Sequence, residues 1–417
     1  VPLTAKDWDH MAAEGFTGVR LLVSWSRLEP KPGHIDTAYL EEIRRQVQAG
    51  AAHGIYSVID MHQDAWGVAV GTPKGTVCPK GTTTAIGWDG APAWATPKAD
   101  ANACISGARE SSELEHDAWD RFYADADGTQ THLVKVWGAV ARSLASEPGV
   151  GGYDLLNEPN PGRDVDQSVA RLAQFYSRSI TAIRAGEKQA GSIAKPIFFE
   201  YTVDGQAVAA DFNSDPGLVF APHLYGGSIA PLTVDQNWDY AENLAKGYKT
   251  AIWAGEYGWF DDDAEKALPK VQRYGQREDQ AMAGGAWWQW RQACGDPHSI
   301  SKPGGTPAKV IVEYQDNGCP GDKNEGVVPQ WHEVVSRPFP QAAPGRLLTL
   351  TSDGKGRTLH LTGTGARSNV VLKVWVPGAA KPKASGTGLG PITVSKVPGG
   401  WDLTAPATAR DYSFTVA

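Results

Sequence analysis

The sequence predicts an α/β protein in which a (β/α)₈ TIM barrel is followed by a C-terminal antiparallel β-sandwich. Helical and strand-like segments alternate from the start of the chain to about residue 290, and from about Arg346 short alternating strands with tight turns take over. Strands that alternate with helices of about 10–20 residues indicate a parallel sheet. A hydrophobic share of 41% and a charged share of 21% are ordinary for a globular chain of 417 residues.

The expected elements follow from apolar periodicity. The segment GVRLLVSW is a continuous apolar strand, and the segment TAYLEEIRRQVQAGAAH places its apolar residues at helical spacing. Helices are expected at residues 5–14, 37–53, 131–145, 164–187, 235–248 and 263–283. Strands are expected at residues 18–25, 56–61, 152–156, 196–201, 218–225, 251–256 and 285–290.

The count of seven strands is one short of a closed barrel, which would normally begin with a strand. Since this chain opens on a helix, we expect that the first strand is missing from it. An open doubly wound sheet is the alternative, but it would place a Gly-rich phosphate-binding turn after its first strand. The sequence has no such turn there.

Three regions are expected along the chain. Residues 1–338 form the catalytic barrel, 339–345 a Pro-rich linker, and 346–417 the sandwich. The last region carries nine Lys and Arg against three Asp and Glu. A basic module of this kind is suited to peripheral contact with anionic lipid surfaces, although an ordinary solvated face explains the same asymmetry.

Composition excludes several classes of protein. The net charge of −8 argues against a nucleic-acid partner. No apolar run approaches the ~18 residues of a membrane span. Sixteen tryptophans beside three methionines are an unusual choice for a core, because Trp is hard to bury completely. Flat indole faces also suit sugar rings, so a sugar-binding site and a Trp-rich core are both open at this point.

Four cysteines form two local couples, Cys78 with Cys104 and Cys294 with Cys319. Each couple lies in a long Gly/Pro-rich insertion, at residues 65–115 and 291–330 respectively. Neither has the spacing of a zinc or redox motif, and of the three possible connectivities we expect the local one. Loop disulfides favour a secreted or extracytoplasmic protein.

Two glutamates at expected strand ends carry the strongest chemical signal. Glu158 belongs to LLNEP (155–159), and Glu256 belongs to GEYG (255–258). If the missing strand is counted, they end the fourth and seventh strands, whose tips face each other across the barrel mouth. Glycoside hydrolases use two carboxyl groups that face each other across a pocket. The alternative is that both glutamates are ordinary surface residues.

These motifs resemble glycoside hydrolase family 5 of clan A. The resemblance implies that Glu158 is the acid/base and Glu256 the nucleophile of a retaining mechanism, with carboxyl groups ~5–5.5 Å apart. It also makes Arg20, in VRLLVSW, a candidate to orient Glu256 and keep it ionised. Burial of Glu158 without a full charge partner should raise its pKa and keep it protonated.

Four further motifs are similar to the endoglycoceramidase branch of that family. They are DMHQD (60–64), GAPAWAT (90–96), YDLLNEP (153–159) and APHLYGG (221–227). This resemblance implies a retaining endo-β-glycosidase that releases the oligosaccharide of glycosphingolipids from ceramide, with no cofactor. It implies substrate contacts from a set of polar and aromatic side chains, namely His62, Asp64, Asn157, His223, Tyr225 and Trp288.

Alternatives remain for the residues and for the function. His62 and Asp64 could be a metal pair, although no third ligand stands out, and Glu200 also ends an expected strand. His223 and Tyr225 could be a satisfied pair in the core. Another family 5 activity, such as an endo-glucanase or a diglycosidase of plant glycosides, would want an open cleft without an apolar exit. A non-catalytic carbohydrate-binding protein is the remaining alternative.

Overall fold

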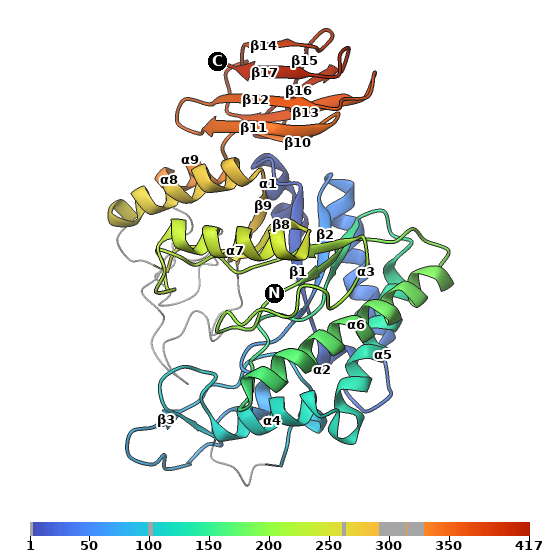
Figure 1. Ribbon diagram of the computed structural model, residues 1–417, viewed down its shortest axis with the longest axis vertical. Helices are drawn as coiled ribbons and strands as arrows, with labels where there is room; N and C mark the ends of the chain where they lie inside the picture. The colour runs from blue at the N-terminus through green and yellow to red at the C-terminus, as the bar shows by residue number, and fades with distance from the viewer. Residues whose placement is uncertain (1–2, 99–102, 261–263, 292–313, 315–328) are drawn as a thin grey trace.

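The computed structural model describes residues 3–98, 103–260, 264–291, 314 and 329–417, and it contains a barrel and a β-sandwich (Figure 1). The barrel sheet has seven parallel strands in the order β1-β2-β5-β6-β7-β8-β9. Their bounds are Gly18–Ser24, Tyr56–His62, Val150–Asp154, Ile197–Phe199, Leu218–Phe220, Ala251–Tyr257 and Gly284–Trp287. The predicted α/β barrel with its C-terminal antiparallel module is therefore confirmed.

Amphipathic helices cover the outside of this sheet. Asp36, Asp164 and Thr233 cap three of them by accepting hydrogen bonds from first-turn amides, which satisfies backbone donors that a helix start leaves free. None of the helices in the described ranges has the length and apolar character that crossing a membrane requires. The helices α1–α9 are Ala5–Ala13, Trp25–Leu28, Thr37–Ala52, Glu113–Tyr123, Thr129–Leu144, Val165–Gln189, Val234–Tyr248, Ala264–Ala281 and Pro329–Val335.

The two edge strands of the barrel sheet, β1 and β9, contact each other without forming a ladder of hydrogen bonds. A cavity of about 610 Å³ lies beside them and reaches Arg20 and Glu256. An eighth strand at this position stays a prediction. The strand ends also differ from those expected. β5 stops at Asp154, so the LLNEP motif leaves the sheet before its first leucine.

Helix α4 was not predicted, and it begins inside the segment expected to be a loop. Ser112 caps it, since the serine hydroxyl accepts from the Glu115 amide at 3.1 Å. Leu114, Ala118 and Phe122 recur at four-residue spacing and are all buried in the barrel core. The Gly/Pro-rich texture of the insertion hid the start of this helix, because only its first three residues lie within the insertion and the rest follow it.

The sandwich consists of two four-stranded antiparallel sheets, β10-β13-β16-β15 and β11-β12-β17-β14. Residues 339–342, predicted as linker, instead form strand β10, whose Phe339 pairs with Trp375 of β13. The two prolines misled the prediction, but β10 is an edge strand, where a proline costs no ladder hydrogen bond. The strands β10–β17 are Phe339–Ala342, Arg346–Asp353, Thr358–Thr364, Val371–Pro377, Ala384–Thr387, Thr393–Val397, Gly400–Pro406 and Tyr412–Val416.

The sandwich is fastened to the barrel near the start of β1. Gly15 has a φ of +78° and lies so close to Trp375 that a Cβ there would meet the indole ring at 2.3 Å. Arg337 reaches back from the sandwich side to Glu278 and Asp279 of α8 at 2.8 and 2.7 Å. In Figure 1 the sandwich and the β3 loop lie at opposite ends of the molecule.

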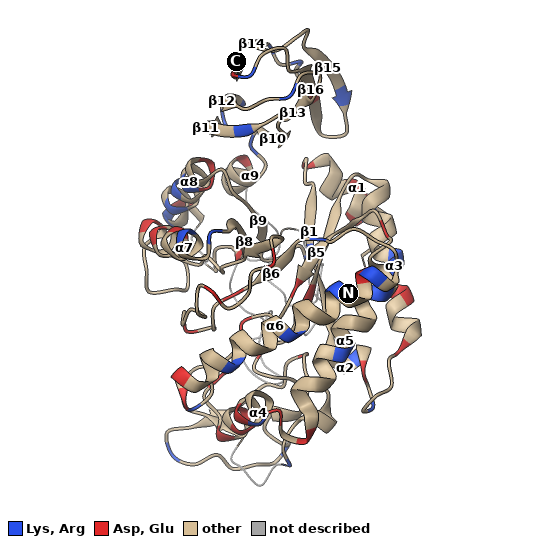
Figure 2. Cartoon of the chain, turned by 45° about the vertical axis from the view of Figure 1, so that its right-hand side comes forward, with Lys and Arg blue, Asp and Glu red and all other residues tan. Residues whose placement is uncertain are grey.

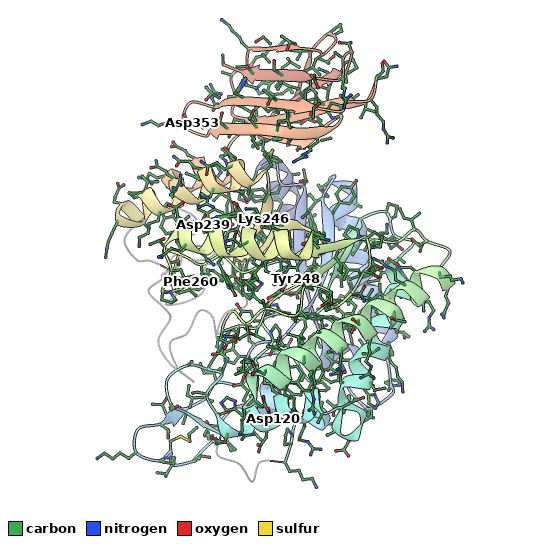
Figure 3. The ribbon with its side chains drawn as sticks, viewed as in Figure 1. Asp120, Asp239, Lys246, Tyr248, Phe260 and Asp353 are labelled. Atoms are coloured by element: carbon green, nitrogen blue, oxygen red, sulfur yellow. A yellow bond between two sulfur atoms is a disulfide. The ribbon has the colours of Figure 1, made fainter. Side chains whose placement is uncertain are left out.

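A disulfide joins Cys78 to Cys104, as predicted, and it is the yellow bond beside the β3 loop in Figure 3. It closes a loop with a sequence separation of 26 residues, next to the short hairpin of β3 (Thr83–Thr84) and β4 (Cys104–Ile105). The second predicted couple, Cys294 with Cys319, lies outside the described residues.

Replacing both Cys78 and Cys104 by serine is expected to loosen this loop, because a cross-link of this span removes about 3 kcal/mol of chain entropy from the opened state. Limited proteolysis should cut the double variant within residues 65–112 much faster than the parent. Equal cleavage rates would show that packing alone holds the loop.

Candidate active site

The two predicted glutamates lie together at the carboxyl ends of their strands. One carboxylate oxygen of Glu158, one of Glu256 and a ring nitrogen of His223 all lie within 4.8 Å of one another. Retaining glycosidases hold their carboxyl groups ~5–5.5 Å apart, whereas inverting enzymes leave ~6.5–9.5 Å for a water molecule. The spacing is therefore that of a retaining pair.

Arg20 is the centre of the hydrogen-bond network beneath the pair. Its side chain is 3% exposed, and its Nη1 donates to Glu256 Oε1 at 2.7 Å. The remaining donors reach buried acceptors at 2.8–3.0 Å, namely Asp60, Asp154, Asn157 and Glu200. Burial alone would lower the pKa of Arg20, but the surrounding carboxylates raise it well above its usual value. Arg20 is thus a permanent cation that fixes the position of Glu256.

Glu256 has hydrogen-bond donors on both of its oxygens. Arg20 occupies Oε1, and the Tyr225 hydroxyl donates to Oε2 at 2.8 Å. His223 Nδ1 lies 3.4 Å from that second oxygen. Burial and the negative charges of Glu256 and Glu158 raise the pKa of Tyr225 well above its usual value, so the phenol keeps its proton and remains a donor. These contacts hold the Glu256 carboxylate in one position.

The prediction of a raised pKa for Glu158 is wrong. Burial does raise it, but the hydrogen bond and charge of His223 and the charge of Arg109 outweigh burial and lower the pKa to about 2. His223 Nδ1 lies 2.8 Å from Oε1, and Arg109 Nη2 lies 2.6 Å from Oε2. The expectation failed because Glu158 has two cationic partners where none was foreseen.

The Glu158 backbone is also unusual. Its φ of +38° is in the left-handed region, which residues with a Cβ rarely adopt. Two contacts hold it there. The Glu158 amide donates to Glu200 Oε2 at 3.2 Å, and the Gln63 side-chain amide donates to the Glu158 carbonyl at 2.9 Å. Strain of this kind is characteristic of functional sites, where surrounding contacts over-determine the conformation.

His223 connects three carboxylates. Its Nδ1 contacts Glu158 and Glu256, and its Nε2 lies 3.1 Å from Glu200 Oε1. Burial would lower the pKa of His223, but the charges of Glu200 and Glu256 and the hydrogen bond to Glu158 raise it well above 6.5. Burial raises the pKa of Glu200 to about 7, despite the opposing effect of His223. These contacts favour the protonated form of His223.

The predicted sugar-binding residues border this network. His62 lies between two carboxylates, with Nδ1 2.7 Å from Asp60 and Nε2 3.2 Å from Asp64. Burial would lower the pKa of His62, but those two acids raise it to about 10. The Trp288 indole stacks on the His62 ring with centroids 5.3 Å apart. Asn157 accepts from Arg20 and donates to the Gln63 carbonyl at 2.8 Å.

Several residues of the site were not assigned from the sequence. Asp60 and Asp154 lie within apolar strands and were read only as parts of motifs, although a charged residue inside a buried strand is itself a signal. Glu200 was noted only as a further glutamate at an expected strand end, yet it contacts Arg20, His223 and the Glu158 amide. Arg109 lies in the long insertion, where no periodicity marks it.

Comparisons with known proteins agree with this geometry. The model of the family described as Cellulase (glycosyl hydrolase family 5) matches residues 3–293. Endoglycoceramidase I of Rhodococcus hoagii (strain 103S) is 33% identical over 241 residues, which cover 54% of this chain and 45% of that protein. The endoglycoceramidase of Cyanea nozakii is 27% identical over 49% of this chain and 43% of its own length. The chain thus spans less than half the length of these curated relatives.

Several solved structures match the whole chain. A crystal structure of an endogalactoceramidase is 38% identical with a TM-score of 0.89, and the match covers 100% of this chain and 91% of that one. Endo-glycoceramidase II from Rhodococcus sp., in its ganglioside GM3 complex, has a TM-score of 0.77 over 100% of this chain and 92% of that one. At 23% identity the second likeness concerns the fold alone.

Proposed function

The chain belongs to glycosyl hydrolase family 5, and from this premise we propose that it is a retaining, endo-acting β-glycosidase that separates the oligosaccharide of glycosphingolipids from ceramide. The observation that carries the proposal is the close Glu158–Glu256 pair at the carboxyl ends of β5 and β8. Likeness to an endogalactoceramidase along the full length of the chain supports glycolipid as the substrate class.

The first step breaks the bond between the sugar and its leaving oxygen. Glu256, oriented by Arg20 and Tyr225, attacks the anomeric carbon with one carboxylate oxygen. Glu158, protonated by then, gives its proton to the departing oxygen, and ceramide leaves as the alcohol. A sugar ester on Glu256 remains, with the configuration at the anomeric carbon inverted once.

The second step releases the sugar. Glu158, now a carboxylate, removes a proton from water, and the resulting nucleophile attacks the anomeric carbon of the ester. Glu256 departs as a carboxylate, and the two inversions together retain the β configuration. Since one side chain acts first as acid and then as base, its pKa must change during the cycle, and the cations around Glu158 can produce that change.

The polar side chains beside the pair bind the sugar in this proposal. Asp64 accepts a hydrogen bond from a hydroxyl of the sugar that precedes the scissile bond, and His62 donates one to a hydroxyl of that sugar. Asn157 contacts its 2-hydroxyl. Trp288 offers its indole to the sugar ring. All four residues lie at or just beyond the ends of their strands, which is where a barrel of this kind binds ligands.

Product analysis by mass tests the proposal. The protein is incubated with gangliosides, neutral glycosphingolipids, cello-oligosaccharides, plant diglycosides and aryl β-glycosides. We expect intact oligosaccharide and ceramide from the glycolipids. Cleavage confined to cello-oligosaccharides or plant glycosides would favour another family 5 activity, and no turnover of any aryl glycoside would favour a non-catalytic carbohydrate-binding protein.

Replacing Glu158 by glutamine is expected to lower kcat/KM for a lactoside with an alkyl leaving group by about 10²–10⁴-fold, which is the usual contribution of general acid–base catalysis. The first step with an aryl leaving group should suffer much less, because that group departs without a proton. Steady-state and burst kinetics on the two substrates measure the contrast. Glu113→Gln, on the exposed start of α4, is the matched control and should leave both rates unchanged. Equal losses on both leaving groups would remove Glu158 from the role of acid.

Location and lipid contact complete the proposal. We place the protein outside the cytoplasm, on the support of the Cys78–Cys104 disulfide. The sandwich carries basic residues on β11 and β15 (Figure 2). Lys396 of β15 is exposed, as are Lys381 and Lys383 just before β14, and exposed lysines suit contact with anionic lipid. The whole protein with Lys381, Lys383 and Lys396 changed to glutamate should sediment less with phosphatidylserine vesicles than the parent. Equal sedimentation would contradict lipid contact through this face.

A further inference from the structure

Arg109 contacts both Asp64, which is proposed to bind the sugar, and Glu158, which is proposed to be the acid. It lies in the turn between β4 and α4, and its side chain is 27% exposed. Nη1 contacts Asp64 Oδ1 and Nη2 contacts Glu158 Oε2, each at 2.6 Å. Nε contacts Glu110, and the guanidinium carbon lies 5.1 Å from the centre of the Trp88 ring.

These contacts conflict with acid catalysis as long as they persist. A general acid must carry a proton and point it at the leaving oxygen. Glu158 Oε1 faces His223 and Oε2 faces Arg109, so each oxygen already has a cationic partner. Asp64, the carboxylate proposed to bind a sugar hydroxyl, is occupied by the same guanidinium. A sugar in this site therefore competes directly with Arg109.

We propose that Arg109 is a positioning residue that the substrate displaces, so that the arrival of the sugar itself converts Glu158 from carboxylate to acid. A sugar hydroxyl takes the place of Nη1 on Asp64, and Nη2 then leaves Glu158. Glu158 takes up one proton from solvent before the leaving oxygen reaches it. The inference rests on the proposed function and adds the origin of the catalytic proton.

Of the two cationic partners of Glu158, we expect Arg109 and not His223 to move away when the sugar binds. His223 is buried among three carboxylates, and the negative charge of Asp64 raises the pKa of Glu158, which favours its protonated form. Arg109 belongs to a turn between β4 and α4. The two ends of this turn are fixed by the disulfide of Cys104 and by the Ser112 helix cap, and Arg109 lies between them. Glu110 and Trp88 can keep the guanidinium paired after it moves away.

Binding of lactose, which has no aglycone to lose, tests the inference without turnover. If binding raises the pKa of Glu158, the affinity must increase as pH falls, by about tenfold per pH unit for one proton. We expect this slope for the parent between pH 4 and pH 5, measured by calorimetry in two buffers that differ in ionisation enthalpy. The Arg109→Gln variant should take up far fewer protons per lactose bound than the parent does. Arg163→Gln, which removes an exposed arginine paired with Glu113, should behave as the parent.

Kinetics on lactosylceramide give a second, independent readout. In the Arg109→Gln variant no contact of Arg109 must be broken before the substrate binds. Its KM should therefore be lower than that of the parent by about three- to tenfold, while kcat stays near that of the parent. A raised KM at constant kcat would mean that Arg109 binds the substrate. A lowered kcat at constant KM would mean that it acts in the transition state.

Either of those kinetic results, or proton uptake that is equal in parent and variant, overturns the displacement. The proposed function fails separately, if lactosylceramide is not cleaved while lactose still binds with the predicted proton uptake. If lactose neither binds nor is released from lactosylceramide, both proposals fail together.

Discussion

Replacing Glu256 by glycine is expected to lower kcat on an aryl β-lactoside by about 10⁴-fold or more, because the variant has no group to form the sugar ester. Sodium azide should restore turnover. The small anion fits the space that the carboxylate leaves, and it attacks the anomeric carbon from the same side. The product should be the α-lactosyl azide, with inverted configuration, identified by NMR.

Two neighbouring glutamates provide the controls for that experiment. Glu158→Gly should also be rescued by azide, but with a β-lactosyl azide, since the azide then attacks the ester on Glu256. Glu200→Gly should give no azide product, because Glu200 contacts Arg20 and His223 and faces no anomeric carbon in the proposed mechanism. An α-azide from either control, or none from Glu256→Gly, would remove Glu256 from the role of nucleophile.

Replacing Arg20 by methionine is expected to destabilise the protein by about 3–5 kcal/mol, which is the usual cost of removing one partner from a buried ionic network. Arg20 contacts four buried carboxylates, and without it they repel one another. Guanidinium denaturation measures the loss. Arg163→Met, at an exposed arginine that also contacts three acids, should change stability by about 1 kcal/mol or less.

The pH dependence of that loss has a definite sign. In the Arg20→Met variant the orphaned carboxyls have folded-state pKa values above their unfolded values, so protonation stabilises the fold. The difference in stability between parent and variant should therefore shrink as pH falls below the folded-state values and grow as pH rises through them. A difference that does not change with pH would mean that Arg20 acts by packing and not by charge.

The sequence predicts the parts of this molecule that depend on local pattern. Apolar strands followed by a polar tip located Glu158 and Glu256, because parallel strands in one barrel bring their carboxyl ends to one face. Helical spacing located α3, α6 and α7 to within a few residues. The β-rich texture after Arg346 located the sandwich, although prolines hid β10.

What the sequence could not predict depends on contacts between distant segments. Arg109 reaches Glu158 from a loop 49 residues earlier in the chain, and no local pattern encodes that approach. The sign of the Glu158 pKa shift follows from this contact and from His223, so the sequence led to the opposite expectation. The partners of Glu200 could not be predicted, because they become visible only when the barrel strands are assembled around Arg20.

The central claim is that Glu256 becomes esterified to the sugar during turnover, and mass spectrometry after reaction with 2-deoxy-2-fluoro-β-lactosyl fluoride tests it most directly. The fluorine at C2 slows both steps, whereas the anomeric fluoride is a good leaving group that keeps the first step fast enough for the ester to accumulate. We predict a protein heavier by one fluorolactosyl group, carried on the peptide that contains Glu256. The same group on the peptide of Glu158 or Glu200, or release of inverted sugar with no adduct, would contradict the account.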